Sequence, residues 1–557
     1  MGFGALATLL IQWNLTRAIL FDDYLARPEI VYENNDETYY LSLISESAKG
    51  NMSLGSPFIK ERSKERFLYP ALNVQVVGMF ERLFHLNTKT VSILFDYFAV
   101  FGVSALVFFA FLSFFQFRSF GYLAAGFYLM FPRMFNMWRR PVSPQINFIP
   151  LAVFLAFYFS RLTFWKRELG LAFAAGIMFY TYPYHWSFAL ALLFISDVFS
   201  CVREKRAVLR LLWKYLVILG MSAWYLTNLF SVYRLPYYKE TMERIGALAS
   251  RMPAGYFTQA LIVLLLALFF IARKYLAKKD LAIPYGNIKK AIFGLLAALV
   301  VLNQQFVTGM QLEFNTHYLP LIIFFVVALI SAGVFVFCER HERHKKIFFA
   351  AGTAVLLAMT SLNVYTRIHD NPFLRETAPW RTAASEVYEW FLQQNIQNTV
   401  VYPPHELAED IPIYTKNYVS FSGLQRLQFI PTDELIDRFS YYDVANASIN
   451  EDLLAHQRLL FGVSYIAQMQ KEEVLGRIKA FFGKSPSRAR QLSEYIPYDF
   501  EALRKKRARA TVAEFEDYLN RYHVDYLIYR KAGKESVYNS VAGIIVFDNG
   551  QYVIKGR

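Results

Sequence analysis

Charged residues and cysteines are both scarce in this chain of 557 residues. Lys, Arg, Asp and Glu make up 18% of it, whereas an average soluble protein carries about a quarter, and 55% of the residues are apolar. This balance excludes both a disordered chain and an ordinary soluble globular protein. The two cysteines, Cys201 and Cys338, form no CxxC pair, so the sequence holds neither a disulfide framework nor a thiolate zinc site.

Motifs of nucleotide and zinc enzymes are missing as well. The chain has no P-loop, no Gly-rich phosphate loop of the Rossmann kind and no HExxH pair. The sequence therefore offers no metal-binding or nucleotide-binding motif from which to infer a function.

The chain does have an excess of positive charge, +15 in all, and that excess is unevenly placed. Residues 1–366 carry 35 basic and 20 acidic residues, whereas residues 367–557 carry 24 of each. The basic run at 504–507 is flanked by acids and is typical of a solvated helical face. We therefore expect no nucleic-acid partner.

Apolar stretches dominate residues 1–366, and a membrane-spanning helix needs about 20 such residues. The pattern predicts a mainly α fold, a polytopic transmembrane bundle of about eleven helices. The expected segments lie near 3–21, 91–115, 119–135, 146–162, 169–182, 185–200, 208–229, 257–272, 289–306, 318–338 and 347–366.

The basic residues between these segments give an expected orientation. Alternate connections carry 18 Lys and Arg on one side and seven on the other, and the richer side is expected to be cytosolic. The N-terminus is then cytosolic, residues 22–90 form a long external loop, and residues 367–557 are external. We expect an integral protein of a prokaryotic plasma membrane, in contact with membrane lipids.

The C-terminal part has the alternation of a soluble α/β domain. Helical spacing over 380–394 runs into a short strand at 399–402, and further strands are expected at 524–529 and 544–547. Asp548-Asn549-Gly550 predicts a hairpin turn into 552–554, and 501–517 reads as a charged helix. Two domains are thus expected, 1–366 in the membrane and 367–557 outside it.

The first external loop contains the residues best suited to chemistry. Asp36 and Glu37 precede Thr38-Tyr39-Tyr40 at the start of an expected helix. Acids in that position also favour the helix N-terminus, so capping is the alternative interpretation. Asp22-Asp23, directly after the first helix, is a second candidate pair with an interfacial alternative.

An acidic pair before aromatics in the first external loop resembles the GT-C class of polytopic glycosyltransferases, especially families related to protein mannosyltransferase and aminoarabinose transferase. The stretch 66–72, Arg-Phe-Leu-Tyr-Pro-Ala-Leu, the Arg139-Arg140-Pro141 loop and the terminal α/β domain are similar to features of that class. The resemblance implies a hexosyl- or pentosyltransferase that uses a polyprenyl-phosphate sugar donor outside the cytosol. The acceptor would be a glycan, a lipid or a protein.

Under this resemblance Asp36 would be the general base, and Glu37 would be its partner or would orient the acceptor. Single displacement by an acceptor hydroxyl would invert the anomeric centre. The substrate-binding candidates are the polar or aromatic side chains near the same membrane face: Arg139, Arg140, His185, His317, Gln305 and Tyr40.

Each of these candidates also has a structural alternative. The arginines could anchor the interface by snorkelling, and lone interfacial histidines are usually solvated. No cofactor is certain, and a divalent metal is possible within the resemblance because the class has members with and without one. A multi-pass transporter or lipid flippase is the alternative function, although the sequence shows no two similar halves. A membrane scaffold with a partner-binding tail is a third.

Overall fold

We describe the chain from a computed structural model. The residues that it describes are 2–22, 24–25, 30–32, 37–65, 71–115, 117–138, 142–143, 145–203, 207–245, 248–249, 256–276, 285–311, 315–340, 342–369, 379–442, 460–461, 472, 475–477, 479–480, 483, 485, 511–531 and 536–557.

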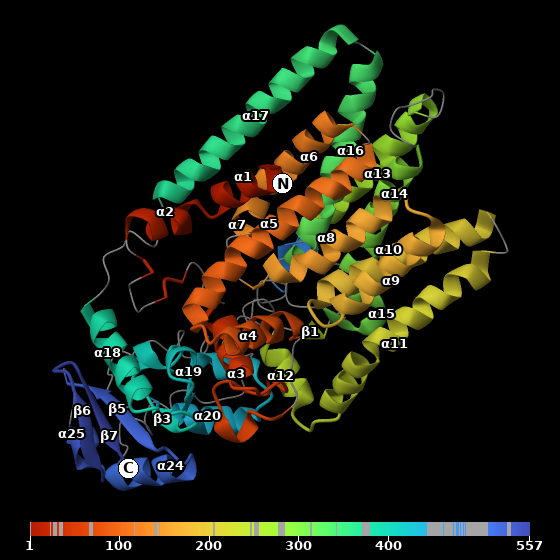
Figure 1. The fold of residues 1–557 in the computed structure, drawn as a ribbon. Helices are drawn as coiled ribbons and strands as arrows, with labels where there is room; N and C mark the ends of the chain where they lie inside the picture. Colours follow the sequence, from red (N-terminus) through yellow and green to blue (C-terminus); the bar gives the residue numbers. More distant parts are fainter. Residues whose placement is uncertain are drawn as a thin grey trace.

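Long apolar helices form one half of the molecule (Figure 1). Among the described residues, six are long and apolar enough to cross a membrane. At a rise of about 1.5 Å per residue, each of these spans is at least as long as the roughly 30 Å of a hydrocarbon core. They contain most of α5 (Thr88–Phe115), α10 (Pro183–Arg203), α11 (Ala207–Tyr233), α14 (Tyr285–Leu302), α16 (Leu319–Arg340) and α17 (Glu342–His369).

The remaining expected segments are also helical, and most of them are broken or short. α1 (Gly2–Ile11) and α2 (Trp13–Phe21) bend by 78° and form a seventh span if they are taken together. α8 and α9 have 15 residues each, about 22 Å, and α6 has 13. The other segments in this region are α6 (Arg118–Met130), α7 (Pro132–Met137), α8 (Gln145–Phe159), α9 (Phe164–Met178) and α13 (Tyr256–Leu276).

Every segment of the expected bundle is therefore helical, and among the described residues six helices, or seven with the bent pair, have the length and composition of a full span. Pro132 and Pro183 set two of the helix boundaries, because proline lacks the N–H that continues a helix and suits its first turn. Pro132 ends α6 and opens α7, and Pro183 opens α10 after α9 has ended at Met178.

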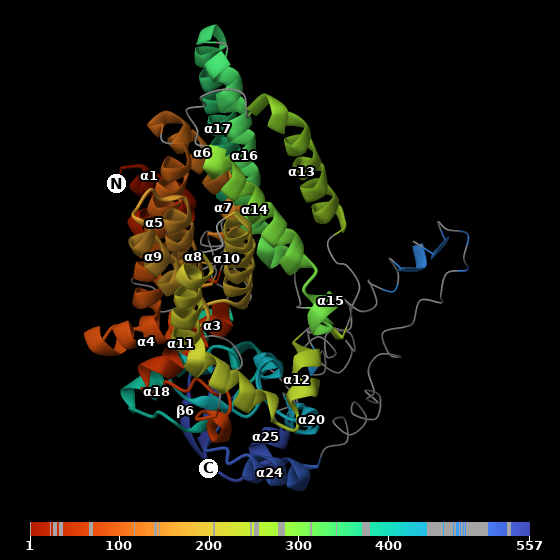
Figure 2. The same cartoon turned by 90° about the vertical axis from the view of Figure 1, so that its right-hand side faces the viewer.

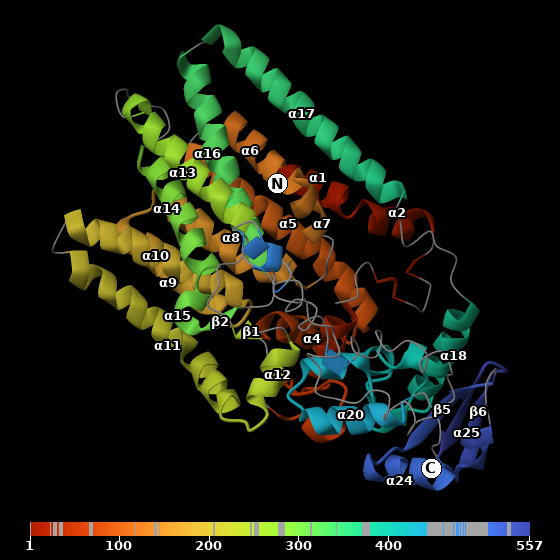
Figure 3. The same cartoon turned by 180° about the vertical axis from the view of Figure 1, so that it is seen from behind.

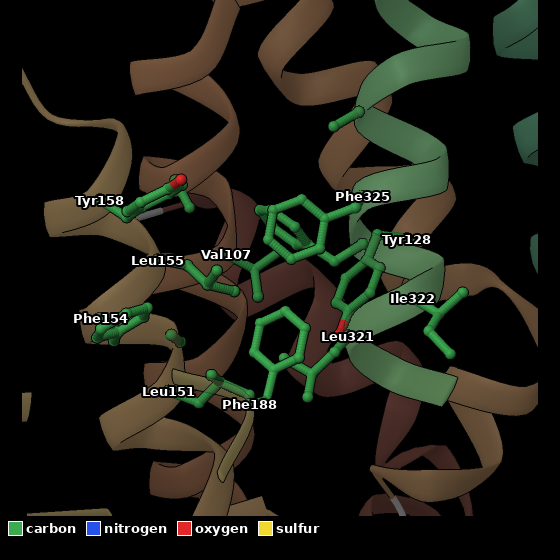
Figure 4. Packing of buried hydrophobic residues seen from close by; sticks show 14 of the residues in the cluster. Val107, Tyr128, Leu151, Phe154, Leu155, Tyr158, Phe188, Leu321, Ile322 and Phe325 are labelled. Carbon is green, nitrogen blue, oxygen red and sulfur yellow. The ribbon is translucent and has the colours of Figure 1, made fainter. Parts of the chain in front are cut away.

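Aromatic and aliphatic side chains fill the centre of the bundle. Val107 of α5, Leu151 of α8, Phe188 of α10 and Phe325 of α16 are at most 1% exposed and belong to one cluster. Figure 4 shows these side chains converging from four helices with Tyr128 of α6 beside them. Many other apolar side chains on these helices point outward, as helices surrounded by lipid require.

The bundle has two distinct ends. In Figure 1 the α16–α17 turn lies at the top and the C-terminal sheet at the bottom, and the quarter turn of Figure 2 shows the same separation. We call these the far end and the domain end. Between the bundle and the sheet lies a layer of short helices: α3 (Glu37–Ala48), α4 (Leu72–Phe84), α12 (Tyr238–Arg244), α19 (Ile411–Tyr414) and α20 (Thr432–Ser440).

A buried ion network ties three helices together near the turn between α10 and α11. Lys214 of α11 is 1% exposed at its side chain and bonds Glu168 of α9 and Asp197 of α10, each at 2.7 Å. Arg167 bonds Glu168 at 2.8 Å, and Lys290 of α14 donates to the carbonyl of Tyr158 at 2.7 Å. Basic residues from two connections expected to be cytosolic therefore share one end of the bundle.

The C-terminal part contains a mixed five-stranded sheet in the order β4-β3-β5-β7-β6. β3 is parallel to β4 and β5, whereas β7 is antiparallel to β5 and β6. The strands expected near 399–402, 524–529, 544–547 and 552–554 are confirmed. The bounds are β3 (Val400–Tyr402), β4 (Tyr418–Val419), β5 (Tyr526–Arg530), β6 (Ile544–Asp548) and β7 (Tyr552–Gly556).

Helices and short turns accompany this sheet. The helix expected at 380–394 is α18 (Pro379–Gln393), while 501–510 of the expected charged helix lies outside the described residues. Gly550 takes φ of 86° in the β6–β7 turn. The remaining elements are α15 (Gln305–Thr308), α24 (Val512–Arg521), α25 (Ser536–Ser540), the 3-10 turns η1 (Lys60–Arg62), η2 (Asn315–Tyr318), η4 (His405–Leu407) and η5 (Gly423–Leu427), and the pair β1 (Leu248–Ala249) and β2 (Met310–Gln311).

A buried arginine fixes the C-terminal part against the bundle. Arg244 of α12 is 2% exposed, and its guanidinium donates to the hydroxyl of Thr432 at 2.6 Å and to the carbonyl of Ile430 at 2.6 Å. Seen from behind in Figure 3, α12 joins α11 to the helices around α20. The C-terminal part is thus packed directly onto the helices of the N-terminal part.

Candidate active site at the domain end

The expected acid pair lies where α3 begins. Asp36 is outside the described residues, and Glu37 is the first residue of α3 and is 4% exposed. The N-terminal N–H groups of a helix favour a nearby negative charge, so this position stabilises a carboxylate. Both the capping interpretation and the catalytic one are compatible with this placement.

The C-terminal part supplies two further acids beside this turn. The hydroxyl of Thr38 donates to Oε2 of Glu409 at 3.1 Å. Asp410 accepts a hydrogen bond from the hydroxyl of Tyr32 at 2.7 Å and a longer one from Tyr388 at 3.3 Å. The first loop and the C-terminal part therefore share a small polar interface around Glu409 and Asp410.

Desolvation shifts both of these carboxyl groups. Burial raises the pKa of Glu409, and the hydroxyl of Thr38 partly offsets that rise. Burial also raises the pKa of Asp410 to about 6; the hydrogen bond from Tyr32 lowers it, and the neighbouring charge of Glu409 raises it further. The interface thus contains a carboxyl group that titrates close to neutral pH.

The two tyrosines after the acid pair have different environments. Tyr39 is 7% exposed and its hydroxyl accepts from the side-chain amide of Gln428 at 3.3 Å. Tyr40, the substrate-binding candidate, is half-buried, and its ring lies edge-on to Tyr39 with centroids 5.8 Å apart. Tyr39 is thus part of the interface packing, and Tyr40 is the more accessible of the two.

His185 and His317 come together although 131 residues separate them. His185 is 1% exposed, and its Nδ1 lies 3.1 Å from the carbonyl oxygen of Asn147. The Nδ1 atom of His317 is hydrogen-bonded to the hydroxyl of Tyr182, and the ring of Tyr182 lies 4.8 Å from that of His185. The aromatic turn before α10 and the turn before α16 therefore form one cluster.

The start of α8 lies between the histidine cluster and the first loop. Ile146 packs on the same hydrophobic cluster as Tyr39 and Tyr40, and the next residue, Asn147, is the one that meets His185. Arg139 and Arg140, just before α8, lie outside the described residues. On either side of them, Trp138 is fully buried and Val142 takes φ of 61°.

The other expected residues are placed as follows. Gln305 opens α15 and is 1% exposed. Asp22 caps the end of α2 through its backbone N–H to the carbonyl of Ala18, whereas Asp23 and the stretch 66–70 are outside the described residues. Within the described residues, no three His, Cys, Asp or Glu side chains are grouped to hold a metal ion. The described residues therefore suggest no metal-dependent step for the proposed chemistry.

Sequence reasoning missed Glu409 and Asp410. They follow the β3 strand and the dipeptide Pro403-Pro404, in a stretch for which the sequence predicts only the end of a strand. Adjacent acids on a soluble surface are common, and nothing in the spacing links them to a loop about 370 residues earlier. Their significance comes only from the contacts with Tyr32 and Thr38.

Comparison with known proteins gives only distant structural likenesses. No family model matches the chain, and no curated protein matches it. The structure is similar to ArnT from Cupriavidus metallidurans bound to undecaprenyl phosphate, with 12% identity, a TM-score of 0.46, and 99% of this chain and 97% of that chain covered. It is also similar to the Archaeoglobus fulgidus oligosaccharyltransferase in complex with Zn and sulfate, with 12% identity, a TM-score of 0.43, and 95% and 68% covered.

A second structure of that oligosaccharyltransferase, tethered to an acceptor peptide, matches with 12% identity, a TM-score of 0.39, and 93% and 69% covered. ArnT and the oligosaccharyltransferase are both GT-C glycosyltransferases, the class that the sequence resembles. At this identity and these TM-scores, the likenesses assign no donor, acceptor or site residue to this chain.

Proposed function

We propose that the chain is a membrane glycosyltransferase that transfers a sugar from a polyprenyl-phosphate donor to an acceptor hydroxyl. One observation carries the proposal: the loop with the acid pair ends in a buried carboxylate at the junction of the bundle and the C-terminal part. This position would bring a lipid-linked donor in the membrane and a water-soluble acceptor to the same carboxylates.

The chemistry requires a base and a held leaving group. The acceptor oxygen attacks the anomeric carbon while Asp36 takes the hydroxyl proton, and the bond from that carbon to the phosphate oxygen breaks. The electron pair leaves with the polyprenyl phosphate, which needs no proton to depart. A single displacement of this kind inverts the anomeric centre. Glu37, fixed at the start of α3, would orient the acceptor or support the charge of Asp36.

The donor would be bound by groups near the histidine cluster. Arg139 and Arg140 precede α8 and would contact the phosphate, since guanidinium groups suit phosphate oxygens. His185 and His317 lie near the start of α8 and would donate to the phosphate or the sugar. Gln305 and Tyr40 would contact the sugar. Membrane lipids surround the bundle, and the catalytic face would be extracytoplasmic.

The test is transfer by purified full-length protein from a panel of polyprenyl-phosphate hexoses and pentoses, measured as released polyprenyl phosphate. Asp36→Asn is expected to lower the rate by at least about a hundredfold, because a general base contributes roughly that much or more. Asp22→Asn is the matched control and is expected to retain activity. Undiminished transfer by Asp36→Asn would refute the role of Asp36, and loss only in Asp22→Asn would move the base to the second pair.

Binding separates this proposal from the alternative of transport. Polyprenyl phosphate alone is expected to raise the melting temperature of both the wild type and Asp36→Asn, because the base does not hold the phosphate. A protein that binds the lipid and moves it across the membrane of a vesicle, but releases no polyprenyl phosphate from any sugar donor, would be a flippase instead.

A further inference from the structure

The C-terminal part holds the first loop on both sides of the acid pair. Before the pair, Tyr32 donates to Asp410 at 2.7 Å and the backbone N–H of Ile30 donates to the hydroxyl of Tyr414 at 2.6 Å. After the pair, Thr38 donates to Glu409 at 3.1 Å. Only four residues, 33–36, separate Tyr32 from Glu37 in the sequence.

The side chain of Asp410 bonds to tyrosine hydroxyls and does not cap the helix that follows it. It is the N-cap residue of α19, yet its side chain makes no capping hydrogen bond. Its two oxygens accept instead from Tyr32 and Tyr388. Tyr388 is itself fixed, because its ring stacks on Tyr414 with centroids 4.6 Å apart and planes 3° apart.

The anchoring continues along α3. The hydroxyl of Ser45 donates to the carbonyl of Pro412 at 2.8 Å, and Glu46 accepts from the hydroxyl of Tyr418 at 2.9 Å. Ser45 and Glu46 are both fully buried. α3 therefore has fixed contacts with the C-terminal part from its first turn to its last, and its position sets the position of Glu37.

We propose that Glu409 and Asp410 are positioning residues that hold the acid-bearing loop in its working geometry. The inference rests on the proposed function for its catalytic consequence. An error of about 1 Å in the placement of a catalytic group can cost roughly a hundredfold in rate. The C-terminal part is then a component of the active site and not only a cover for it.

Hydrogen exchange of the full-length protein in detergent tests the anchoring without any substrate. Asp410→Asn, Glu409→Gln, Tyr32→Phe and Thr38→Val each remove part of a described hydrogen bond. Each is expected to speed exchange in peptides covering residues 37–44 by roughly tenfold, the effect of one hydrogen bond to a charged acceptor. Thr38→Ser keeps the hydroxyl and is expected to exchange like the wild type.

Asp437→Asn is a matched control in the same part of the chain. Asp437 also accepts from a tyrosine, Tyr522 at 2.6 Å, but it lies on α20 and contacts Arg521 of α24. This variant is expected to leave exchange at 37–44 unchanged. Peptides from α18 and β3 report whether the C-terminal part stays folded, since general unfolding would speed their exchange as well.

Two results would overturn the inference. One is exchange at 37–44 that is the same in Asp410→Asn, Glu409→Gln and Thr38→Val as in Asp437→Asn. The other is an active wild type whose transfer rate is unchanged in Asp410→Asn and Thr38→Val, where a loss of at least tenfold with rescue by Thr38→Ser is expected. A wild type that transfers no sugar would instead refute the proposed function, and the exchange result would decide the anchoring alone.

Discussion

At the residue scale, Asp410 shows how burial and hydrogen bonding oppose each other in one carboxyl group. Desolvation favours its neutral form, whereas the hydroxyls of Tyr32 and Tyr388 favour its charged form. The net effect raises its pKa from 3.8 to about 6. A neutral Asp410 loses one acceptor site, so its bond to Tyr32 depends on pH.

We predict a specific pH dependence of stability from this shift. Because the folded state binds the proton more tightly, the contribution of Asp410 is fully present below about pH 4 and is lost as the pH rises through about 6. The free energy of unfolding is expected to fall by roughly 2 kcal/mol over this range, because solvent screens part of the effect at a half-buried group. The other titratable and charged groups that act on it are Glu409, Tyr32, Tyr388 and Arg381.

The measurement is the difference in melting temperature between the wild type and Asp410→Asn at pH 4.5 and pH 7. Asn cannot ionise, so the wild type should lose stability relative to the variant as the pH rises. A difference that is constant across this range would contradict the prediction. Asp437→Asn provides the comparison for general effects of replacing an aspartate.

The local setting of several candidate residues could be predicted from the sequence. Glu37 and Tyr40 lie at the start of an expected helix, and His185 lies in an aromatic turn. Glu409 and Asp410 could not be predicted, because their role depends on contacts with Tyr32 and Thr38 across about 370 residues. A local sequence pattern predicts the secondary structure around a residue, but it does not predict which distant residue will contact it.

At the element scale, the helices of the bundle were predictable while their lengths were not. Apolar composition marks the long helices between α5 and α17, but an apolar window also includes the turns between α6, α7 and α8. The short strand β4 was missed because two residues beside buried turns leave no alternating pattern. The strands β5, β6 and β7 were found because each has five residues and a Gly550 turn joins the last two.

The ion network of α9, α10 and α11 gives a prediction at this scale. Replacing Lys214 by Met would leave Glu168 and Asp197 as buried carboxylates without their shared cation. The free energy of unfolding is expected to fall by about 3–5 kcal/mol, which is typical of removing one partner from a buried ion pair. The measurement is the melting temperature or the denaturation midpoint of the full-length protein in one detergent.

A compensated variant distinguishes loss of charge balance from loss of packing. Lys214→Met combined with Glu168→Gln and Asp197→Asn removes the buried charges together and should recover most of the stability, because neutral replacements avoid the desolvation penalty. If Lys214→Met alone is as stable as the wild type, the network does not hold these helices together.

At the scale of the whole molecule, the position of the +15 net charge along the chain indicates the orientation of the protein in the membrane. The bundle gathers Arg167, Lys214 and Lys290 near the α10–α11 turn, and its connections expected to be cytosolic carry 18 basic residues, while the C-terminal part has equal numbers of basic and acidic residues. Basic residues in short loops are retained on the cytosolic side of a membrane. The far end should therefore be cytosolic, and the C-terminal part should be outside.

Cysteine labelling in a bacterial host tests this orientation directly. Cys201 and Cys338 are first replaced by Ser and Ala, and one cysteine is then introduced at an exposed position: Gln551→Cys in the β6–β7 turn or Lys166→Cys in the first turn of α9. A maleimide that does not cross membranes should label Gln551→Cys on intact spheroplasts and Lys166→Cys only after lysis. The opposite result would place Glu37 and its loop on the cytosolic face, where the proposed reaction with an extracytoplasmic donor could not occur.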